Sequence, residues 1–184
     1  MGVSDGSYSV GPHAGRLLIR TARTGLGAKA GHDLTLEVTR WRGNVAVDAA
    51  SPASSAVAVE AEVASIEVRE GTGGVKPLTD ADRAEIRQTM SGKILQAGRY
   101  PTINFQSTLV GGSPEAFWIE GDLTISGTTH PVTVHGSLAA GRARGSATIT
   151  QSDWGIKPYS AFFGALRLRD EVEVEFDVAL ASAG

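Results

Sequence analysis

The chain has 184 residues, 41% of them hydrophobic and 20% charged, and this length and composition suit one globular domain that spans residues 1–184. The net charge of -3 provides no basic surface, so a nucleic-acid partner is not expected. The absence of cysteine excludes disulfides, thiolate metal sites and cysteine nucleophiles.

The N-terminal residues contain no charged segment followed by an apolar one, and no apolar run approaches the length of a membrane span. We therefore expect a cytoplasmic protein with no stable membrane insertion. We also expect residues 1–6 to be flexible.

Apolar and polar residues alternate through most of the chain, and this two-residue period predicts antiparallel β-strands with one face toward a core. The clearest case is a hairpin over residues 117–138, in which a Gly-Thr-Thr turn at residues 127–129 joins two alternating segments. Pro131 falls at the start of the second strand, where a missing donor costs least. Eight long strands are predicted, at residues 17–22, 32–38, 57–63, 103–109, 117–126, 132–138, 143–150 and 172–180. Two short segments, at residues 8–10 and 45–47, also alternate.

One helix is predicted between the strands, over residues 80–90. Thr79 places a hydroxyl three residues before Asp82, which is the pattern of a capped helix N-terminus. Ile86 and Met90 lie one turn apart, so we expect them to rest together on one end of the sheet.

The pattern predicts an all-β fold, an eight-stranded antiparallel barrel with one short helix and an aromatic loop at a barrel end. A two-sheet sandwich is the alternative, because alternation does not show whether a sheet closes. Small residues on the inward side favour a barrel with room for one small ligand. These residues are Ala61, Gly121, Gly136, Ala143, Gly145 and Ala147.

Five segments, taken together in their order and spacing, resemble the YceI-like proteins, also called polyisoprenoid-binding lipocalin-like proteins. The segments are Ala30–Thr35, Gly98–Phe105, Gly121–Val132, Ser152–Ile156 and Leu168–Val172. The resemblance implies a lipocalin-like barrel that holds a long isoprenoid or other amphiphilic lipid, which the protein carries or stores. It also implies a homodimer.

The predicted ligand contacts are inward residues of the strands together with aromatic residues of segment 153–164. That segment, DWGIKPYSAFFG, places four aromatic residues among glycine and proline, which indicates a loop that either plugs the barrel or gates ligand entry. We favour the gate. We expect His32, which begins the apolar side of its strand, to meet a ligand head group. The predicted contacts are His32, Leu34, Leu36, Val45, Val59, Ile103, Phe105, Ile119, Leu123, Ile149, Trp154, Phe162, Phe163, Leu166 and Leu168.

Two other classes of function stay open. An enzyme acting on an amphiphile, such as a hydrolase or isomerase, needs a base and a polarising group in the cavity, and the candidates are His32, His130 and Asp170. They form no convincing catalytic set, so a non-enzymatic protein is expected. A barrel filled by its own side chains would be a structural module. His130 and His135 point to opposite faces of one strand and cannot chelate one ion, and no metal or other cofactor is expected.

Overall fold

The computed structural model describes residues 3–161 and 166–181, and in these residues eleven strands form one antiparallel sheet and three short strands form another. The strands are β1 (Gly6–Val10), β2 (Gly15–Thr21), β3 (Arg23–Thr24), β4 (Asp33–Val38), β5 (Trp41–Val47), β6 (Ala56–Glu62), β7 (Ile66–Thr72), β8 (Thr102–Ser113), β9 (Ala116–Ile125), β10 (Thr128–Ala139), β11 (Arg142–Thr150), β12 (Ser160–Ala161), β13 (Leu166–Leu168) and β14 (Glu171–Ala179). The helical elements are η1 (Ala28–Ala30), η2 (Pro52–Ser54), η3 (Val63–Ser65), α1 (Asp80–Gln88), η4 (Thr89–Ile94) and η5 (Gln151–Trp154).

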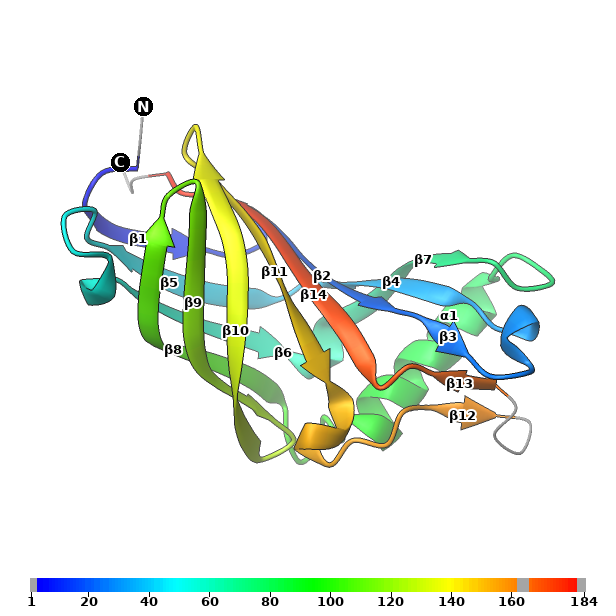
Figure 1. Cartoon of the computed structure of the whole chain (residues 1–184). Helices are drawn as coiled ribbons and strands as arrows, with labels where there is room; N and C mark the ends of the chain where they lie inside the picture. The colour runs from blue at the N-terminus through cyan, green and yellow to red at the C-terminus, as the bar shows by residue number, and fades with distance from the viewer. Residues whose placement is uncertain (1–2, 162–165, 182–184) are drawn as a thin grey trace.

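The main sheet curls because β5, next to one edge strand, and β4, next to the other edge strand, are consecutive in the chain (Figure 1). The order is β1-β5-β6-β8-β9-β10-β11-β14-β2-β4-β7. Near one end β5 pairs with β1 and β6, and near the other end β4 pairs with β2 and β7. Only Thr39 and Arg40 separate β4 from β5, so the backbone itself holds the two ends of the order together.

The predicted number of eight strands is wrong, because the two short predicted segments form full strands of the sheet, β1 and β5, and β7 was not predicted. The stretch of β4 and β5 bends at Thr39 and Arg40, and the 3₁₀-helix η3 separates β6 from β7. Ser65 fixes this bend, since its Oγ donates to the Glu62 carbonyl at 2.8 Å and accepts from the Arg40 N–H at 3.0 Å. The sandwich alternative is also wrong, because the long strands all belong to one sheet.

The hairpin predicted for residues 117–138 is confirmed as β9 and β10, whose register runs from Ile125 opposite Thr128 to Phe117 opposite Gly136. Its turn lies earlier than predicted. Ser126 and Gly127 have φ values of 49° and 77°, and two residues of positive φ form the hairpin turn that best matches strand twist.

The predicted helix is confirmed as α1, including its capping box. The Thr79 hydroxyl oxygen accepts from the Asp82 N–H at 3.1 Å, and the Asp82 carboxylate accepts from the Thr79 N–H at 2.8 Å. The π-helix η4 prolongs α1 beyond the predicted end. Ile86 and Met90 both lie on the wall of the cavity that the sheet surrounds, so this helical segment covers one part of it.

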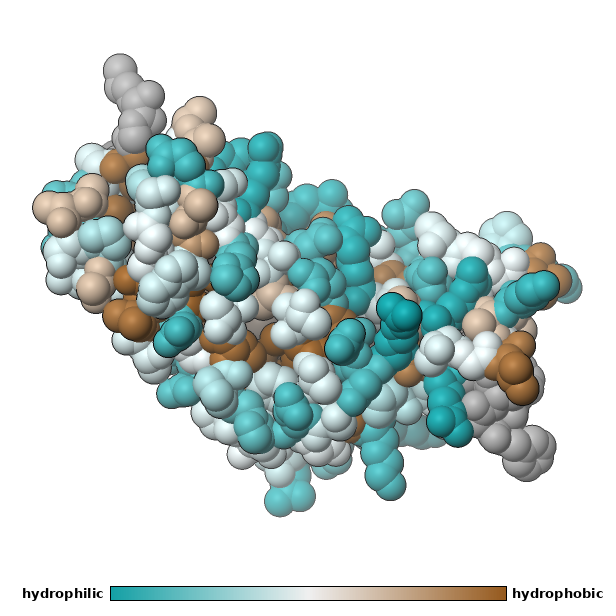
Figure 2. Space-filling view, in the orientation of Figure 1, coloured by the Kyte–Doolittle hydropathy of each residue, from teal (hydrophilic) through white to brown (hydrophobic). Residues whose placement is uncertain are grey.

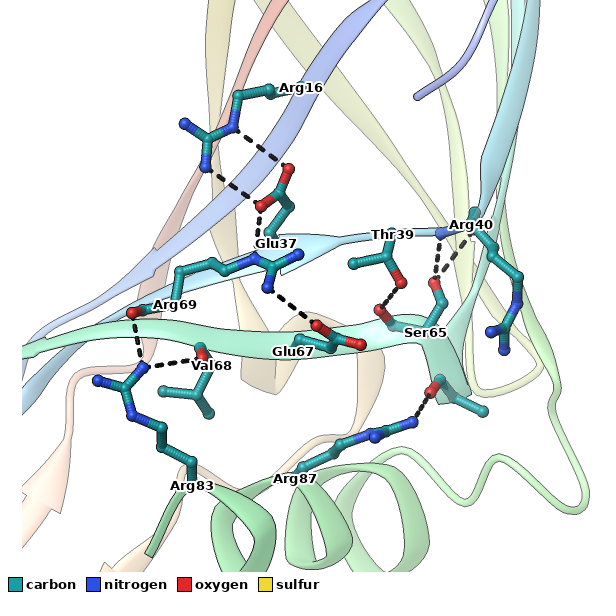
Figure 3. A network of polar contacts seen from close by, with 11 residues as sticks. Arg16, Glu37, Thr39, Arg40, Ser65, Glu67, Val68, Arg69, Arg83 and Arg87 are labelled. Atoms are coloured by element: carbon teal, nitrogen blue, oxygen red, sulfur yellow. Dashed lines mark hydrogen bonds and ion pairs between the residues drawn. The ribbon is translucent and has the colours of Figure 1, made fainter. Parts of the chain in front are cut away.

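Arginine side chains fasten α1 to β7, which has a sheet neighbour on one side only (Figure 3). Arg83 Nη1 donates to the carbonyl oxygens of Val68 at 3.2 Å and Arg69 at 2.7 Å. Arg87 Nη2 donates to the Ala64 carbonyl at 3.0 Å. These charge-assisted bonds satisfy backbone acceptors of β7 and η3 and hold the helix against both.

Two hydrogen bonds join residues 4 and 5 to the rest of the fold, residues 1–2 lie outside the described residues, and the flexibility of residues 1–6 stays a prediction. Tyr8 Oη donates to the Ser4 carbonyl at 2.6 Å, and the Ala49 N–H donates to the Asp5 carboxylate at 2.7 Å. Val3 lies on the cavity wall.

Glu37, on β4, lies between two arginines, and its charge is expected to make the stability of the fold depend on pH. Its Oε2 lies 3.1 Å from Arg16 Nη2 and 2.6 Å from Arg69 Nε, and its side chain is 17% exposed. Arg16 first, and Arg69 after it, hold the pKa of this carboxyl below its usual value of 4.5. As the pH falls, the unfolded chain therefore binds the proton first. The stabilisation is complete above the unfolded pKa and is lost as the pH falls through the lower pKa of the folded chain.

Glu37→Gln tests this expectation through unfolding by denaturant at a series of pH values from 7 downward. The free energy of unfolding should differ most between wild type and variant near neutral pH, and the difference should shrink as the pH falls. Glu120→Gln is the control, because Glu120 is exposed on β9 and has no ion pair in the described part of the chain. A difference for Glu37→Gln that stays constant with pH would show that this ion pair does not contribute.

Candidate functional site

The curled sheet and the segment of α1 and η4 surround a cavity of about 1400 Å³. Pockets for small molecules usually measure about 300–1,000 Å³, so this cavity has room for a larger ligand. Its wall is mostly apolar. Figure 2 shows apolar side chains in a hollow where β10 and β11 diverge, since these strands pair only between His135–Ala139 and Arg142–Ser146.

Polar residues lie on the wall at both ends of the cavity. His32 directly precedes β4 and Asp48 directly follows β5, so they lie at opposite ends of an almost continuous strand. Lys76 lies beside His32, and Glu115, in the turn between β8 and β9, lies at the Asp48 end. An elongated amphiphile can therefore keep a polar group near water while its apolar part lies along the middle.

Most of the predicted contact residues lie on the cavity wall, although their part in binding stays a prediction. These are His32, Leu34, Leu36, Val45, Val59, Ile103, Phe105, Ile119, Leu123, Ile149 and Leu168. Phe162 and Phe163 lie outside the described residues. The backbone of Leu166 belongs to β13, but its side chain also lies outside what the structure describes.

Trp154 is not among the residues of the cavity wall, and its role as a ligand contact stays a prediction. The indole is 4% exposed and packs in a cluster with Ile125, Ala147, Ile149 and Ile156. Its Nε1 donates to the Leu123 carbonyl at 2.9 Å. A buried indole with a satisfied donor has no reason to move when a ligand enters. These contacts favour the plug over the gate for Trp154.

The sequence predicted that small inward residues leave room for a ligand. This is wrong for the glycines among them and holds for the alanines. Three glycines on the inward side are covered by phenylalanine rings, and a Cβ on any of them would lie within 2.6 Å of the nearest ring atom. The pairs are Gly121 with Phe105, Gly136 with Phe117, and Gly145 with Phe176. The inward alanines do line the cavity, and they are Ala61, Ala143 and Ala147.

His32 is half-buried at the end of the cavity, and the neighbouring loop fixes its ring. Its Nε2 lies 2.7 Å from the Lys76 carbonyl, which only accepts, so Nε2 carries the proton and donates. Gly74 packs on the ring so closely that a Cβ there would lie 2.4 Å from Nε2. The Lys76 carbonyl therefore occupies Nε2, and Nδ1 is left for another partner.

The three residues considered for catalysis each have a separate partner. His32 contacts Lys76, and His130 packs its ring edge-on against Trp154 with centroids 5.4 Å apart. The Asp170 carboxylate accepts from the Ser152 N–H at 2.8 Å and from the Ser152 hydroxyl. In residues 3–161 and 166–181 no group of three or more His, Asp or Glu side chains is placed to hold a metal ion.

Loop residues on the cavity wall were missed from the sequence because they follow no period. Val75, Lys76, Pro77 and Leu78, between β7 and α1, lie on the wall. Tyr159 also lies there and was counted only as part of the aromatic segment. A cluster of apolar residues in a Gly- and Pro-rich loop was the one available signal.

No helix in the described part of the chain is both long and apolar enough to cross a bilayer.

Comparison with solved structures gives the same fold at low sequence identity. BcnA of Burkholderia cenocepacia superposes with a TM-score of 0.65 at 18% identity, over 90% of this chain and 96% of that one. A polyisoprenoid-binding domain from Saccharophagus degradans superposes with a TM-score of 0.57 at 9% identity, over 97% of this chain and all of the other.

Comparison of sequences points to one family. A UPF0312 protein of Pseudomonas paraeruginosa is 37% identical over 89 residues, which are 42% of this chain and 47% of the relative. Another, from Pseudomonas savastanoi pv. phaseolicola, is 30% identical over 130 residues, which are 64% of this chain and 60% of the relative. The chain thus spans about half the length of the first of these relatives, and somewhat more of the second. The family model of the YceI-like domain matches residues 18–180, and the chain therefore belongs to the YceI-like family.

Proposed function

We propose that the protein binds one long-chain amphiphile, an isoprenoid lipid or a lipid of similar length, inside the cavity, and that it carries or stores this ligand. In this proposal the curled sheet acts as a lipocalin-like barrel around the lipid. The observation that carries the proposal is the cavity itself, which measures about 1400 Å³ and has an apolar middle between polar ends.

The chemistry of the wall supports a ligand that is bound rather than converted. The apolar residues stabilise a long hydrocarbon chain by removing it from water, by about 0.8 kcal/mol for each buried methylene group. Binding asks for no reactive group. Membership in the YceI-like family supports lipid binding as well, because one structural neighbour is itself named a polyisoprenoid-binding domain.

Native mass spectrometry of protein purified from its own organism tests this proposal. We expect one additional mass per chain, and extraction with organic solvent should release a lipid with one long apolar chain. Reloading the extracted protein with a polyprenyl alcohol should restore the complex. Protein that carries no lipid and takes up no polyprenyl alcohol of any length would overturn the proposal.

His32→Phe is expected to preserve the fold and to weaken the binding of a polar-headed lipid. The phenyl ring keeps the shape of the wall but cannot form a hydrogen bond, so the loss falls on the head group. A polyprenyl alcohol should lose about fivefold to tenfold in affinity, as for one hydrogen bond. A plain hydrocarbon of matched length should bind as before. Equal losses for both ligands would make His32 a packing residue.

A further inference from the structure

Apolar side chains are exposed at the end of the molecule where His32 lies on the cavity wall. Leu26 is fully exposed and Val75 is 80% exposed, each on a loop of its own. Tyr159 is 45% exposed, lies on the cavity wall and directly precedes β12, which pairs with β13 and through it with β3. Figure 1 shows the loops after β3 and β7 together at the end of the molecule away from the chain termini. We call Leu26, Val75 and Tyr159 the apolar rim.

Lysines that form no ion pair in the described part of the chain lie close in sequence to residues of the apolar rim. Within the described residues every ion pair involves an arginine, and none involves a lysine. The chain has four lysines, and three of them lie close to rim residues in the sequence. Lys29 is three residues from Leu26, Lys76 is next to Val75, and Lys157 is two residues from Tyr159.

Acidic residues at this end are partly engaged. The Asp33 carboxylate accepts from the Arg23 N–H at 2.8 Å, and that of Asp82 caps α1. Asp80 and Glu85 are exposed on α1 and oppose the lysine charges. The apolar rim is therefore expected to contribute more to any association than the charge does.

We propose that the apolar rim docks the protein reversibly on the surface of a lipid bilayer, so that the ligand passes between bilayer and cavity without crossing water. The proposal rests on the proposed function, because it concerns the route of the same ligand. Crossing water would expose every methylene group of the chain, whereas a mouth that touches the bilayer keeps the chain covered. Exposed apolar side chains beside free lysines are the combination that binds a bilayer surface.

A protein partner fits the apolar rim less well than a bilayer. A stable protein interface buries about 800 Å² on each partner. Three separated side chains, of which an aromatic one supplies at most about 250 Å², fall short of that area. A bilayer needs no complementary shape, and a few inserted side chains suffice for reversible association.

Sedimentation with vesicles tests the proposal, using phosphatidylcholine alone and phosphatidylcholine mixed with phosphatidylglycerol. We expect wild-type protein to bind both, and the mixed vesicles more strongly because of the lysines. Leu26→Glu should weaken vesicle binding by about tenfold, since it removes an apolar side chain and adds a negative charge. Leu109→Glu is the matched control, because Leu109 is 41% exposed on β8 and is neither part of the apolar rim nor on the cavity wall.

Leu26→Trp should retain vesicle binding, and the fluorescence emission of the variant should shift to shorter wavelength when vesicles are added. The proposal is overturned if wild type binds no vesicles, or if Leu26→Glu and Leu109→Glu weaken binding equally. It is also overturned if the wild type forms a dimer that Leu26→Glu dissociates, because a second copy would then cover the rim. Binding of polyprenyl alcohol without vesicles should be the same for both glutamate variants, so a failure of the proposed function is seen separately.

Discussion

Replacing Ala61 by phenylalanine is expected to prevent long-chain lipids from binding while shorter ones still bind. Ala61 lies on the cavity wall and pairs with Trp41, which begins β5 at the kink halfway between the two polar ends. A ring there would obstruct the lengthwise path. Excluding about four methylene groups at about 0.8 kcal/mol each costs about 3 kcal/mol, or about a hundredfold in affinity.

Ala58→Phe is the matched control for this prediction. Ala58 lies on the same strand with the opposite side-chain parity, and it is not part of the cavity wall. The Ala58→Phe variant should bind lipids of every chain length with the affinity of the wild type. Equal binding of long chains to the wild type and Ala61→Phe, with both folded, would mean that the lipid does not extend past this point.

Gly145→Ala is expected to destabilise the fold strongly, by about 1–3 kcal/mol or more, because the new methyl group has no space. Its Cβ would lie 2.5 Å from the His135 carbonyl oxygen on β10 and 2.6 Å from Cζ of Phe176 on β14. The backbone contact cannot be relieved by rotating a side chain. The midpoint of denaturant unfolding measures the effect.

Gly92→Ala is the control for the glycine prediction. It lies in η4, where a Cβ would meet nothing within 4 Å. Alanine there should leave stability unchanged or raise it by up to about 1 kcal/mol, because glycine is the poorer helix former. If Gly145→Ala unfolded at the same denaturant concentration as wild type, the packing of Phe176 on Gly145 would be wrong.

The faces of the strands could be predicted from the sequence because one face of each strand meets water and the other meets the cavity. Leu36, Phe105 and Leu123 lie on the cavity wall as their parity predicts. The capping box of α1 could be predicted as well, since Thr79 and Asp82 interact within one helical turn. Both signals are local, and local signals survive in a single sequence.

What could not be predicted depends on contacts between distant segments. The occupied space over Gly145 depends on its register with Phe176, which the alternation of one strand does not contain. The bend at η3, after which the unpredicted β7 begins, depends on bonds such as that from Arg40 to Ser65. The hydrogen bond from Trp154 to the Leu123 carbonyl joins segments that are far apart in the sequence. The sequence showed only the aromatic side chain, which suggested a ligand contact.

The central claim, that one long lipid lies along the cavity, is tested most directly by calorimetric titration of delipidated protein with polyprenyl alcohols of increasing length. We predict one ligand per chain and an affinity that rises with each added isoprene unit until the chain fills the cavity, after which it levels off. An affinity that does not change with chain length, or several ligands bound per protein, would contradict the claim.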